Sequence, residues 1–310
     1  MNSVLPDTGL VPRFYGGDRA ACVVVSEDLG QGTSLVDVLQ GTDPDYARES
    51  LVLQAQALAE LHAHTLGQEA RYWQVRDALG PRGAPRDWKR YGILEDTQGW
   101  GNLRALQPEL QKAFDQLGQH VPTAFWDEYA SLVAAIENPS PFRAYVQNDS
   151  CPDNTLITPG RLRLLDFERG GYHLCLLDAA YCRLSMPHCF WAARLPADIA
   201  PIVERAYRQR LAYALPEAAD DRLFGRAMTE ACAYWIISNG MWMVHRSFDQ
   251  DFPWGAATWR QRVFLRLEQF AATTKEFSHL QEMGAAARET LRRLKTHWTC
   301  EPMPYFRAFR

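Results

Sequence analysis

Three polar residues near the middle of the chain have types and spacing that suit phosphoryl transfer. Asp149 follows a short apolar run, Asn154 comes five residues later, and Asp166 stands directly after Leu164-Leu165. In phosphoryl transfer one carboxylate accepts the proton of an attacking hydroxyl. An amide oxygen and a second carboxylate hold the Mg²⁺ that neutralises the phosphates. The order of the residues predicts Asp149 as the base and Asn154 and Asp166 as the metal ligands.

Short β-prone segments surround these residues and would position them. Residues 143–146, 155–158 and 161–165 each have the composition of a strand, and Pro159-Gly160 predicts a turn between the last two. A strand, a loop and a hairpin would bring the three polar side chains to one end of a small sheet. The alternative is an ordinary surface loop, since Asp, Asn and Pro are common turn residues. Asp166, at the end of an apolar run, favours the chemical interpretation.

These residues resemble the aminoglycoside phosphotransferase and choline kinase-like family. Its catalytic loop reads His-Gly-Asp, four further residues and Asn, and a hairpin then leads to a metal-binding Asp. Here Gln147-Asn148-Asp149 stands at the position of His-Gly-Asp, and residues 177–180 resemble a later Asp-x-Ala segment. Upstream, residues 58–62 resemble the family's Leu-x-x-Leu-His helix. Residues 23–30 resemble the last strand of a small lobe that runs into a hinge.

The resemblance implies an α+β, protein kinase-like fold with ATP and Mg²⁺ as cofactors. Residues 1–29 would form a truncated small β lobe and the hinge, and residues 30–310 a large, mainly helical lobe with the catalytic β-hairpin. Gln147 and Asp178 would support the catalytic loop. The hinge residues that would contact the adenine through backbone groups are Ser26, Glu27, Asp28 and Leu29.

The sequence departs from the family pattern in two places. Gln147 and Asn148 replace the usual His and Gly, so the loop keeps its base without its common supporting pair. The family's small lobe has a Gly-rich loop and a phosphate-pairing Lys before the hinge, whereas the first Lys of this chain is Lys89. We therefore expect the first part of the small lobe to be missing, with a true start upstream of Met1 as one explanation.

Two functions from different classes follow. The first is an ATP- and Mg²⁺-dependent kinase that phosphorylates a hydroxyl group of a small molecule; the alternative is a non-catalytic, kinase-derived module that binds a nucleotide or metabolite. Aminoglycosides, choline-like amines, sugars and amino alcohols all stay open as substrates. Residues 223–244 form an apolar helical segment for which core packing is the default interpretation. The candidate substrate residues on it are Glu230, Asn239 and Trp242.

The composition limits the class of protein and its possible partners. The 310 residues are 47% hydrophobic with a net charge of −4, which indicates a folded globular protein and gives no support for nucleic-acid binding. We expect no membrane span and no signal peptide. The seven cysteines contain no Cys-x-x-Cys pair, which favours a reducing cytoplasm. We interpret Cys175, Cys182 and Cys189 as buried packing residues and expect Cys151 to be accessible. The oligomeric state is left open.

The remaining pattern predicts the framework. Residues 10–15 and 21–26 would form a hairpin separated by Gly16-Gly17-Asp18, and Asp43-Pro44 would begin a helix with His62 as a core residue. Residues 67–102 contain several Gly and Pro residues and are expected to be irregular. Helices are predicted over residues 103–119 and 122–137, and almost throughout the chain beyond Ala197.

Overall fold

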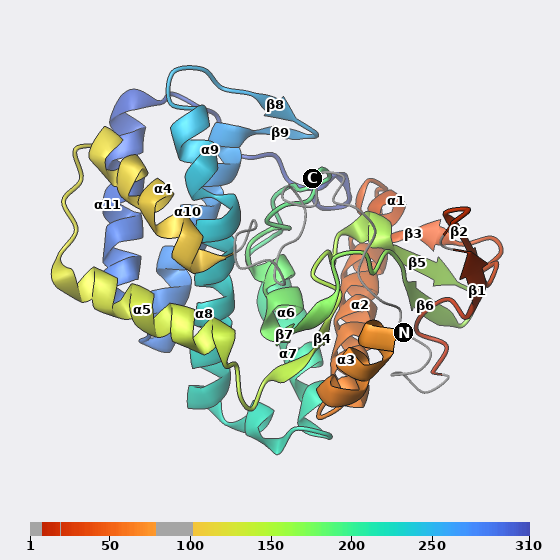
Figure 1. Cartoon of the computed structure of the whole chain (residues 1–310). Coiled ribbons are helices and arrows are strands. Elements are labelled where there is room, and N and C mark those ends of the chain that lie inside the picture. Colours follow the sequence, from red (N-terminus) through yellow and green to blue (C-terminus); the bar gives the residue numbers. More distant parts are fainter. Residues whose placement is uncertain (1–7, 19, 79–101) are drawn as a thin grey trace.

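The structure is a computed structural model that describes residues 8–18, 20–78 and 102–310. Helices dominate and short antiparallel strands accompany them (Figure 1), which confirms the predicted α+β class. The helices are α1 (Leu35–Leu39), α2 (Pro44–Thr65), α3 (Glu69–Ala78), α4 (Leu103–Gln116), α5 (Thr123–Glu137), α6 (Leu176–Arg183), α7 (Ile199–Ala212), α8 (Asp221–Asn239), α9 (Met241–Arg246), α10 (Trp259–Phe277) and α11 (Gln281–His297). The strands are β1 (Phe14–Asp18), β2 (Val23–Ser26), β3 (Thr33–Ser34), β4 (Arg143–Val146), β5 (Thr155–Thr158), β6 (Arg161–Leu164), β7 (Gly171–Leu174), β8 (Pro253–Trp254) and β9 (Ala257–Thr258).

The strands of the described residues form four small antiparallel sheets. They are β1-β2, β3-β5-β6, β4-β7 and β8-β9. The strands before and after the loop that carries Asp149, β4 and β5, therefore belong to different sheets. The single small sheet predicted from the sequence is wrong, because β4 pairs with β7, a strand that the sequence pattern did not predict.

The β5–β6 hairpin forms where it was predicted. Thr155 pairs with Leu164 at its open end, and Gly160 in the turn has a φ of +76°, a conformation that favours glycine. Beyond the last pair, the Leu165 N–H donates to the Asn154 carbonyl at 2.9 Å. This bond brings the residues that follow β6 next to the residues that precede β5.

Helix α2 begins as its sequence predicts. The Asp43 side chain accepts hydrogen bonds from the first-turn N–H groups of Asp45 and Tyr46, and Pro44 occupies the first helical position. Its buried face packs against α7 and includes His62, which is fully buried. The interpretation of His62 as a hydrogen-bonded core histidine is confirmed.

The apolar segment predicted as one helix over residues 223–244 is divided between two helices. Helix α8 is buried along most of its length and ends at Asn239, and α9 begins at Met241 after Gly240. A Cβ on Gly240 would lie 2.5 Å from the Ile236 carbonyl oxygen, so a larger residue would clash with the backbone there. Figure 1 shows α6 between α8 and the region of α2 and the small sheets. No helix in the described part of the chain has both the length and the apolar composition that a membrane crossing requires.

Two N-terminal expectations need correction. Gly16, Gly17 and Asp18 lie within β1 rather than in the turn, because β1 runs to Asp18 before the chain reverses. Residues 69–78 form helix α3 rather than irregular chain, and residues 79–101 of the same predicted stretch lie outside the described residues.

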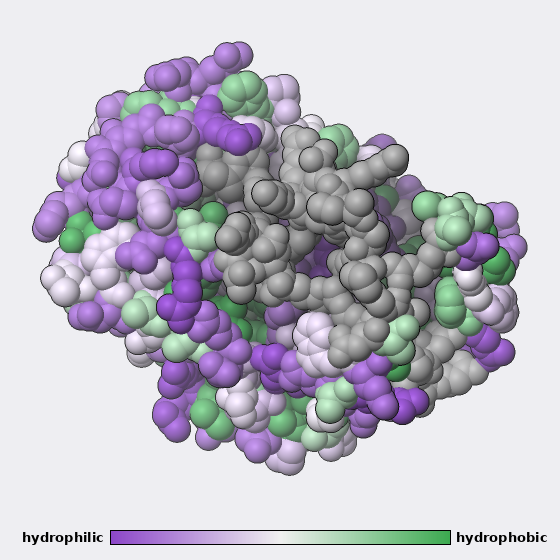
Figure 2. Space-filling view, viewed as in Figure 1, coloured by the Kyte–Doolittle hydropathy of each residue, from purple (hydrophilic) through white to green (hydrophobic). Residues whose placement is uncertain are grey.

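The β1–β2 hairpin exposes apolar side chains. Val24 is 73% exposed and Tyr15 is 61% exposed. Figure 2 shows apolar residues at the edge of the molecule where Figure 1 places this hairpin.

Candidate active site

The segment that carries Asp149 leaves β4 and enters a short 3₁₀ turn, Pro152–Asn154. Gln147 and Asn148 are fully buried, whereas the Asp149 side chain is 16% exposed. Asn148 has a φ of +58°, in the left-handed region, where Gly is favoured and Asn is among the better-tolerated alternatives. The Asn that replaces the family's Gly therefore keeps the backbone turn that precedes the proposed base.

Asp178, in the first turn of α6, binds the start of this loop. Its two carboxylate oxygens accept the N–H groups of Gln147 at 2.8 Å and Asn148 at 2.9 Å. His62 Nε2 lies 3.1 Å from the same carboxylate, and Tyr207 holds the other ring nitrogen of His62 at 2.8 Å. Asp178 and His62, which lie far apart in the sequence, thus fix the loop backbone from the core side.

Gln147 links the loop to the segment of Asp166. Its side-chain amide donates to the Leu165 carbonyl, the residue immediately before Asp166. Gln147 and the left-handed Asn148 therefore each have a definite structural place in this loop.

Asn154 and Asp166 lie at the same end of the β5–β6 hairpin. Asn154 Nδ2 donates to the Asp149 carbonyl at 2.9 Å, which leaves its amide oxygen for another partner. The Asp166 carboxylate is exposed, and its nearest backbone donor, the Glu168 N–H, is 3.5 Å away. A carboxylate oxygen and an amide oxygen are the hard ligands that Mg²⁺ prefers. The donor set therefore fits Mg²⁺.

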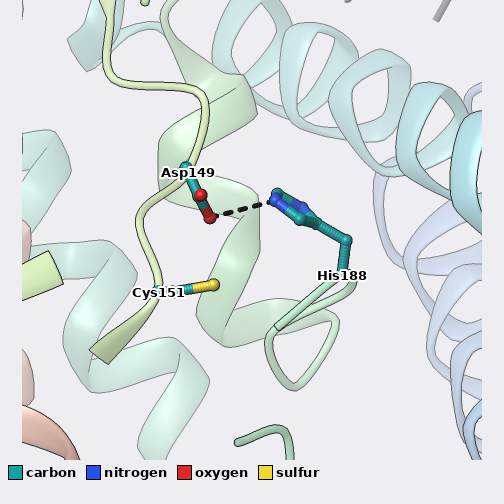
Figure 3. Close-up of side chains that lie close together, drawn as sticks. All are labelled: Asp149, Cys151 and His188. Atoms are coloured by element: carbon teal, nitrogen blue, oxygen red, sulfur yellow. Dashed lines mark ion pairs between the residues drawn. The ribbon is translucent and has the colours of Figure 1, made fainter. Parts of the chain in front are cut away.

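Asp149 has an ionised carboxylate. Burial would raise the pKa of Asp149, but His188, Cys151 and the charge of Arg169 together lower it to about 2. His188 Nε2 lies 3.0 Å from Asp149 Oδ1 (Figure 3), and burial lowers the pKa of His188 below its ordinary value despite this carboxylate. Near neutral pH the pair is therefore a carboxylate and a neutral imidazole.

His188 was not singled out from the sequence. It lies in the segment after α6, 39 residues beyond Asp149, and only the folding of that segment brings it to the loop. Tyr181 Oη is 2.8 Å from its Nδ1, and the Trp235 ring stacks on it at 5.0 Å between centroids. Arg169, whose charge reaches Asp149, was also missed, although its position three residues after Asp166 is a usable signal.

Cys151 is buried, with 5% of its surface exposed, so its predicted accessibility is wrong. The cause is the 3₁₀ turn, which directs this residue inward toward Cys189. Burial raises the pKa of the Cys151 thiol well above its ordinary value, and the neighbouring Cys189 and Asp149 raise it further. Cys175, Cys182 and Cys189 are buried, as predicted.

The proposed hinge lies at the edge of the molecule. The Glu27 N–H donates to the Arg13 carbonyl at 2.8 Å, and the Glu27 carboxylate accepts from Arg163 at 2.6 Å. Asp28 accepts the Gly30 N–H at 2.9 Å. Ser26 and Asp28 are exposed, and Leu29 is half-buried, so backbone groups of these three residues lie near the surface.

The substrate candidates on the helical half have different surroundings. Glu230 is buried and is already paired with Arg226 at 2.9 Å and His279 at 3.1 Å. Asn239 follows Trp235 by four residues and so shares the helix face that reaches His188. The Trp242 side chain lies outside the described part of the structure.

No protein-family model and no curated protein matches the chain. Among solved structures, it is similar to a choline/ethanolamine kinase family protein from Mesorhizobium loti, at 16% identity over 91% of this chain and 80% of that one, with a TM-score of 0.42. An ethanolamine kinase from Plasmodium vivax gives 13% identity over 84% and 68% of the two chains and a TM-score of 0.46. A choline kinase from Cryptosporidium parvum gives 13% identity over 93% and 77%, with a TM-score of 0.44. These proteins belong to the group that the sequence motifs resemble.

Proposed function

We propose that this protein is an ATP- and Mg²⁺-dependent phosphotransferase that acts on a hydroxyl group of a small molecule. The observation that carries the proposal is a connected set of hydrogen bonds around the three chemical residues. Asp178 holds the loop N–H groups, Gln147 binds Leu165 beside Asp166, and Asn154 binds the Asp149 carbonyl. These bonds fix the backbone that carries Asp149 and Asp166 and the amide of Asn154, which supports a chemical role for the loop.

Each residue then has a separate task. Asp149 accepts or orients the proton of the substrate hydroxyl, for which its low pKa suits an orienting acceptor better than a strong base. Asn154 and Asp166 would hold Mg²⁺, which when bound neutralises phosphate charge. The exposed backbone of Ser26, Asp28 and Leu29 would contact the adenine. His188 Nε2 lies 3.0 Å from Asp149 Oδ1 and would have to move away for a substrate hydroxyl to bind that oxygen.

A binding module without catalysis is the second candidate, and the Asp149–His188 pair favours it. The Asp149 carboxylate already has the His188 imidazole at 3.0 Å, so one of its oxygens is less available to a substrate hydroxyl.

The first prediction is that Asp149→Asn lowers phosphoryl transfer by at least about 100-fold, because the amide cannot accept the hydroxyl proton. The measurement is transfer of labelled γ-phosphate from Mg²⁺-ATP to a panel of amino alcohols, aminoglycosides and sugars. Asp153→Asn, on the same loop, is the matched control and should stay within a few-fold of the parent. Equal rates in the parent and Asp149→Asn would remove Asp149 from the chemistry. Transfer to no member of the panel would favour the binding module.

A further inference from the structure

Three different metal-ligating groups converge at Asp149. One oxygen of Asp149, the sulfur of Cys151 and one ring nitrogen of His188 all lie within 4.8 Å of one another. Figure 3 shows the Cys151 sulfur beside the Asp149–His188 pair, with the residues contributed by two separate segments. We propose that these three side chains form a site for a zinc-class divalent cation, with a fourth position open to water or another ligand.

The chemistry of the three donors separates this site from the proposed Mg²⁺ site. Zinc accepts thiolate, imidazole and carboxylate ligands at about 2.0–2.3 Å, and three protein ligands with one open position is a common arrangement. Mg²⁺ takes oxygen ligands and has little affinity for thiolate. Asn154 and Asp166 offer oxygen atoms, whereas this cluster offers sulfur and nitrogen as well. The two sites would therefore select different cations.

His188 is already oriented as a metal ligand. Its Nδ1 has Tyr181 Oη at 2.8 Å, the same oxygen lies 3.2 Å from Nε2, and the Trp235 ring stacks on its face. Nε2 is the nitrogen that lies 3.0 Å from Asp149 Oδ1. A metal-bound histidine usually donates its second N–H to a neighbouring group, and Tyr181 provides such an acceptor. The buried Asp149 Oδ1 has no hydrogen bond of good geometry among the described residues, although His188 is close. A cation between these groups would satisfy that oxygen.

A buried arginine fixes the segment that carries His188. Arg262 is fully buried beside the proposed cation site, and its charge interacts with Cys189 and Cys151. Arg262 donates to the carbonyls of Cys189 and Phe190, which fixes the segment next to His188. Metal binding would release the Cys151 thiol proton to solvent and form the metal–sulfur bond.

A second group shares Cys151 with this site. The ligand atoms of Cys151, Asp153 and Cys189 also lie within 4.8 Å of one another. Asp153 is exposed and already accepts from Trp191 Nε1 at 3.2 Å, so one of its carboxylate oxygens is engaged. The group of Asp149, Cys151 and His188 contains an imidazole that is only 9% exposed and the Asp149 Oδ1 atom, which lacks a well-placed hydrogen-bond donor. We therefore assign the cation to Asp149, Cys151 and His188.

A bound cation would remove the Asp149 carboxylate from the proposed transfer reaction. Metal affinity is nevertheless measured without nucleotide or substrate, so the inference does not depend on the proposed function. A site of this kind would make the protein sensitive to zinc even if it transfers no phosphate. Conversely, a protein that binds no zinc could still be a kinase.

The test is titration of the full chain with Co²⁺ under reducing conditions, followed by displacement with Zn²⁺. A thiolate ligand gives a sulfur-to-cobalt charge-transfer band in the near ultraviolet. We expect this band with one equivalent of Co²⁺ in the parent, and at least 10-fold weaker binding in Cys151→Ser and His188→Gln. Cys182→Ser changes a buried cysteine elsewhere and should bind as the parent does. Circular dichroism without metal confirms that each variant is folded, and the Zn²⁺-induced rise in Tm, expected in the parent and lost in both ligand variants, is a second measure of binding.

Three results would overturn the assignment. The first is a parent protein without the band, and the second is an unchanged band in Cys151→Ser. The third is a band that is lost in Cys189→Ser and kept in His188→Gln, which would move the site to the group with Asp153. If His188→Gln does not fold, Asp149→Asn replaces it, and parent-like Co²⁺ affinity in that variant would equally refute the site.

Discussion

The residues before Asp149 perform two separate physical tasks. Asn148 adopts a left-handed conformation that most side chains resist, and Gln147 uses its amide to bind the carbonyl of Leu165. Neither task requires the residue types of the family pattern. The identity of a residue in a catalytic loop therefore says less than the contact that it makes.

Asp178 provides the strongest residue-scale prediction. It is buried and accepts two backbone N–H groups and lies against His62 Nε2. Asp178→Asn would place an NH₂ group against one of these donors, so charged hydrogen bonds in the core are replaced by an unsatisfied donor. We expect the free energy of unfolding to fall by about 2–4 kcal/mol. Urea unfolding measures the effect.

The control for Asp178 is Asp198→Asn, an exposed residue that lies 3.8 Å from Arg48. A surface change of this kind should stay within about 0.5 kcal/mol of the parent. If Asp178→Asn unfolds at the same urea concentration as Asp198→Asn, the carboxylate does not hold the loop.

At the scale of elements, local patterns predicted most helices and the β5–β6 hairpin. Asp43-Pro44 marks the start of α2, and Pro159-Gly160 marks the hairpin turn, because capping and turn chemistry depend on neighbouring residues. The pairing of β4 with β7 was not predicted, since strand partners depend on contacts distant in sequence. His188 was missed for the same reason. Asp149, Asn154 and Asp166 could be proposed from the sequence because their spacing is local.

The β4–β7 ribbon carries the pH-dependence prediction. His173 on β7 faces Ala144, next to Arg143, which pairs with Glu69. Burial and the charge of Arg143 lower the pKa of His173 to about 3. In the unfolded chain His173 binds a proton below about pH 6.5, whereas in the folded chain it binds one only below about pH 3. The free energy of unfolding therefore falls as the pH decreases from about 6.5 to about 3.

The measurement compares the free energy of unfolding at pH 7.5 and pH 5.5 in the parent and in His173→Gln. The parent should lose about 1.4 kcal/mol more than the variant between these values, because glutamine does not titrate. His120→Gln, at an exposed position, is the matched control and should show the loss of the parent. A His173→Gln variant with the parent's pH dependence would contradict the burial argument.

For the whole molecule, the site depends on segments from across the chain. The proposed base and metal ligands lie in the chain between β4 and β7. Residues of α2, α6 and the segment of His188 contact the loop that carries the proposed base. The proposed hinge follows the exposed β1–β2 hairpin. A two-stranded ribbon with exposed apolar residues is marginally stable by itself. The proposed hinge therefore follows a weakly supported ribbon at the edge of the molecule.

This arrangement predicts a hydrogen-exchange response to nucleotide. Without ligand, amides of β1 and β2 should exchange much faster than those of the buried helix α8. Mg²⁺-ATP should slow exchange of the Asp28 and Leu29 amides, which we propose contact the adenine. The Glu27 amide should respond less, because its N–H is already bonded to the Arg13 carbonyl.

The metal requirement is tested in the same experiment with Asp166→Ala. Its carboxylate is exposed, so its loss should leave the fold unchanged and remove the part of the protection that depends on Mg²⁺. Calorimetry on the same samples should show weaker ATP binding in the variant when Mg²⁺ is present and no difference when it is absent. Equal ATP affinity with and without Mg²⁺ in both proteins would exclude the Asp166 metal site, and unchanged exchange at residues 26–29 would place the nucleotide away from the hinge.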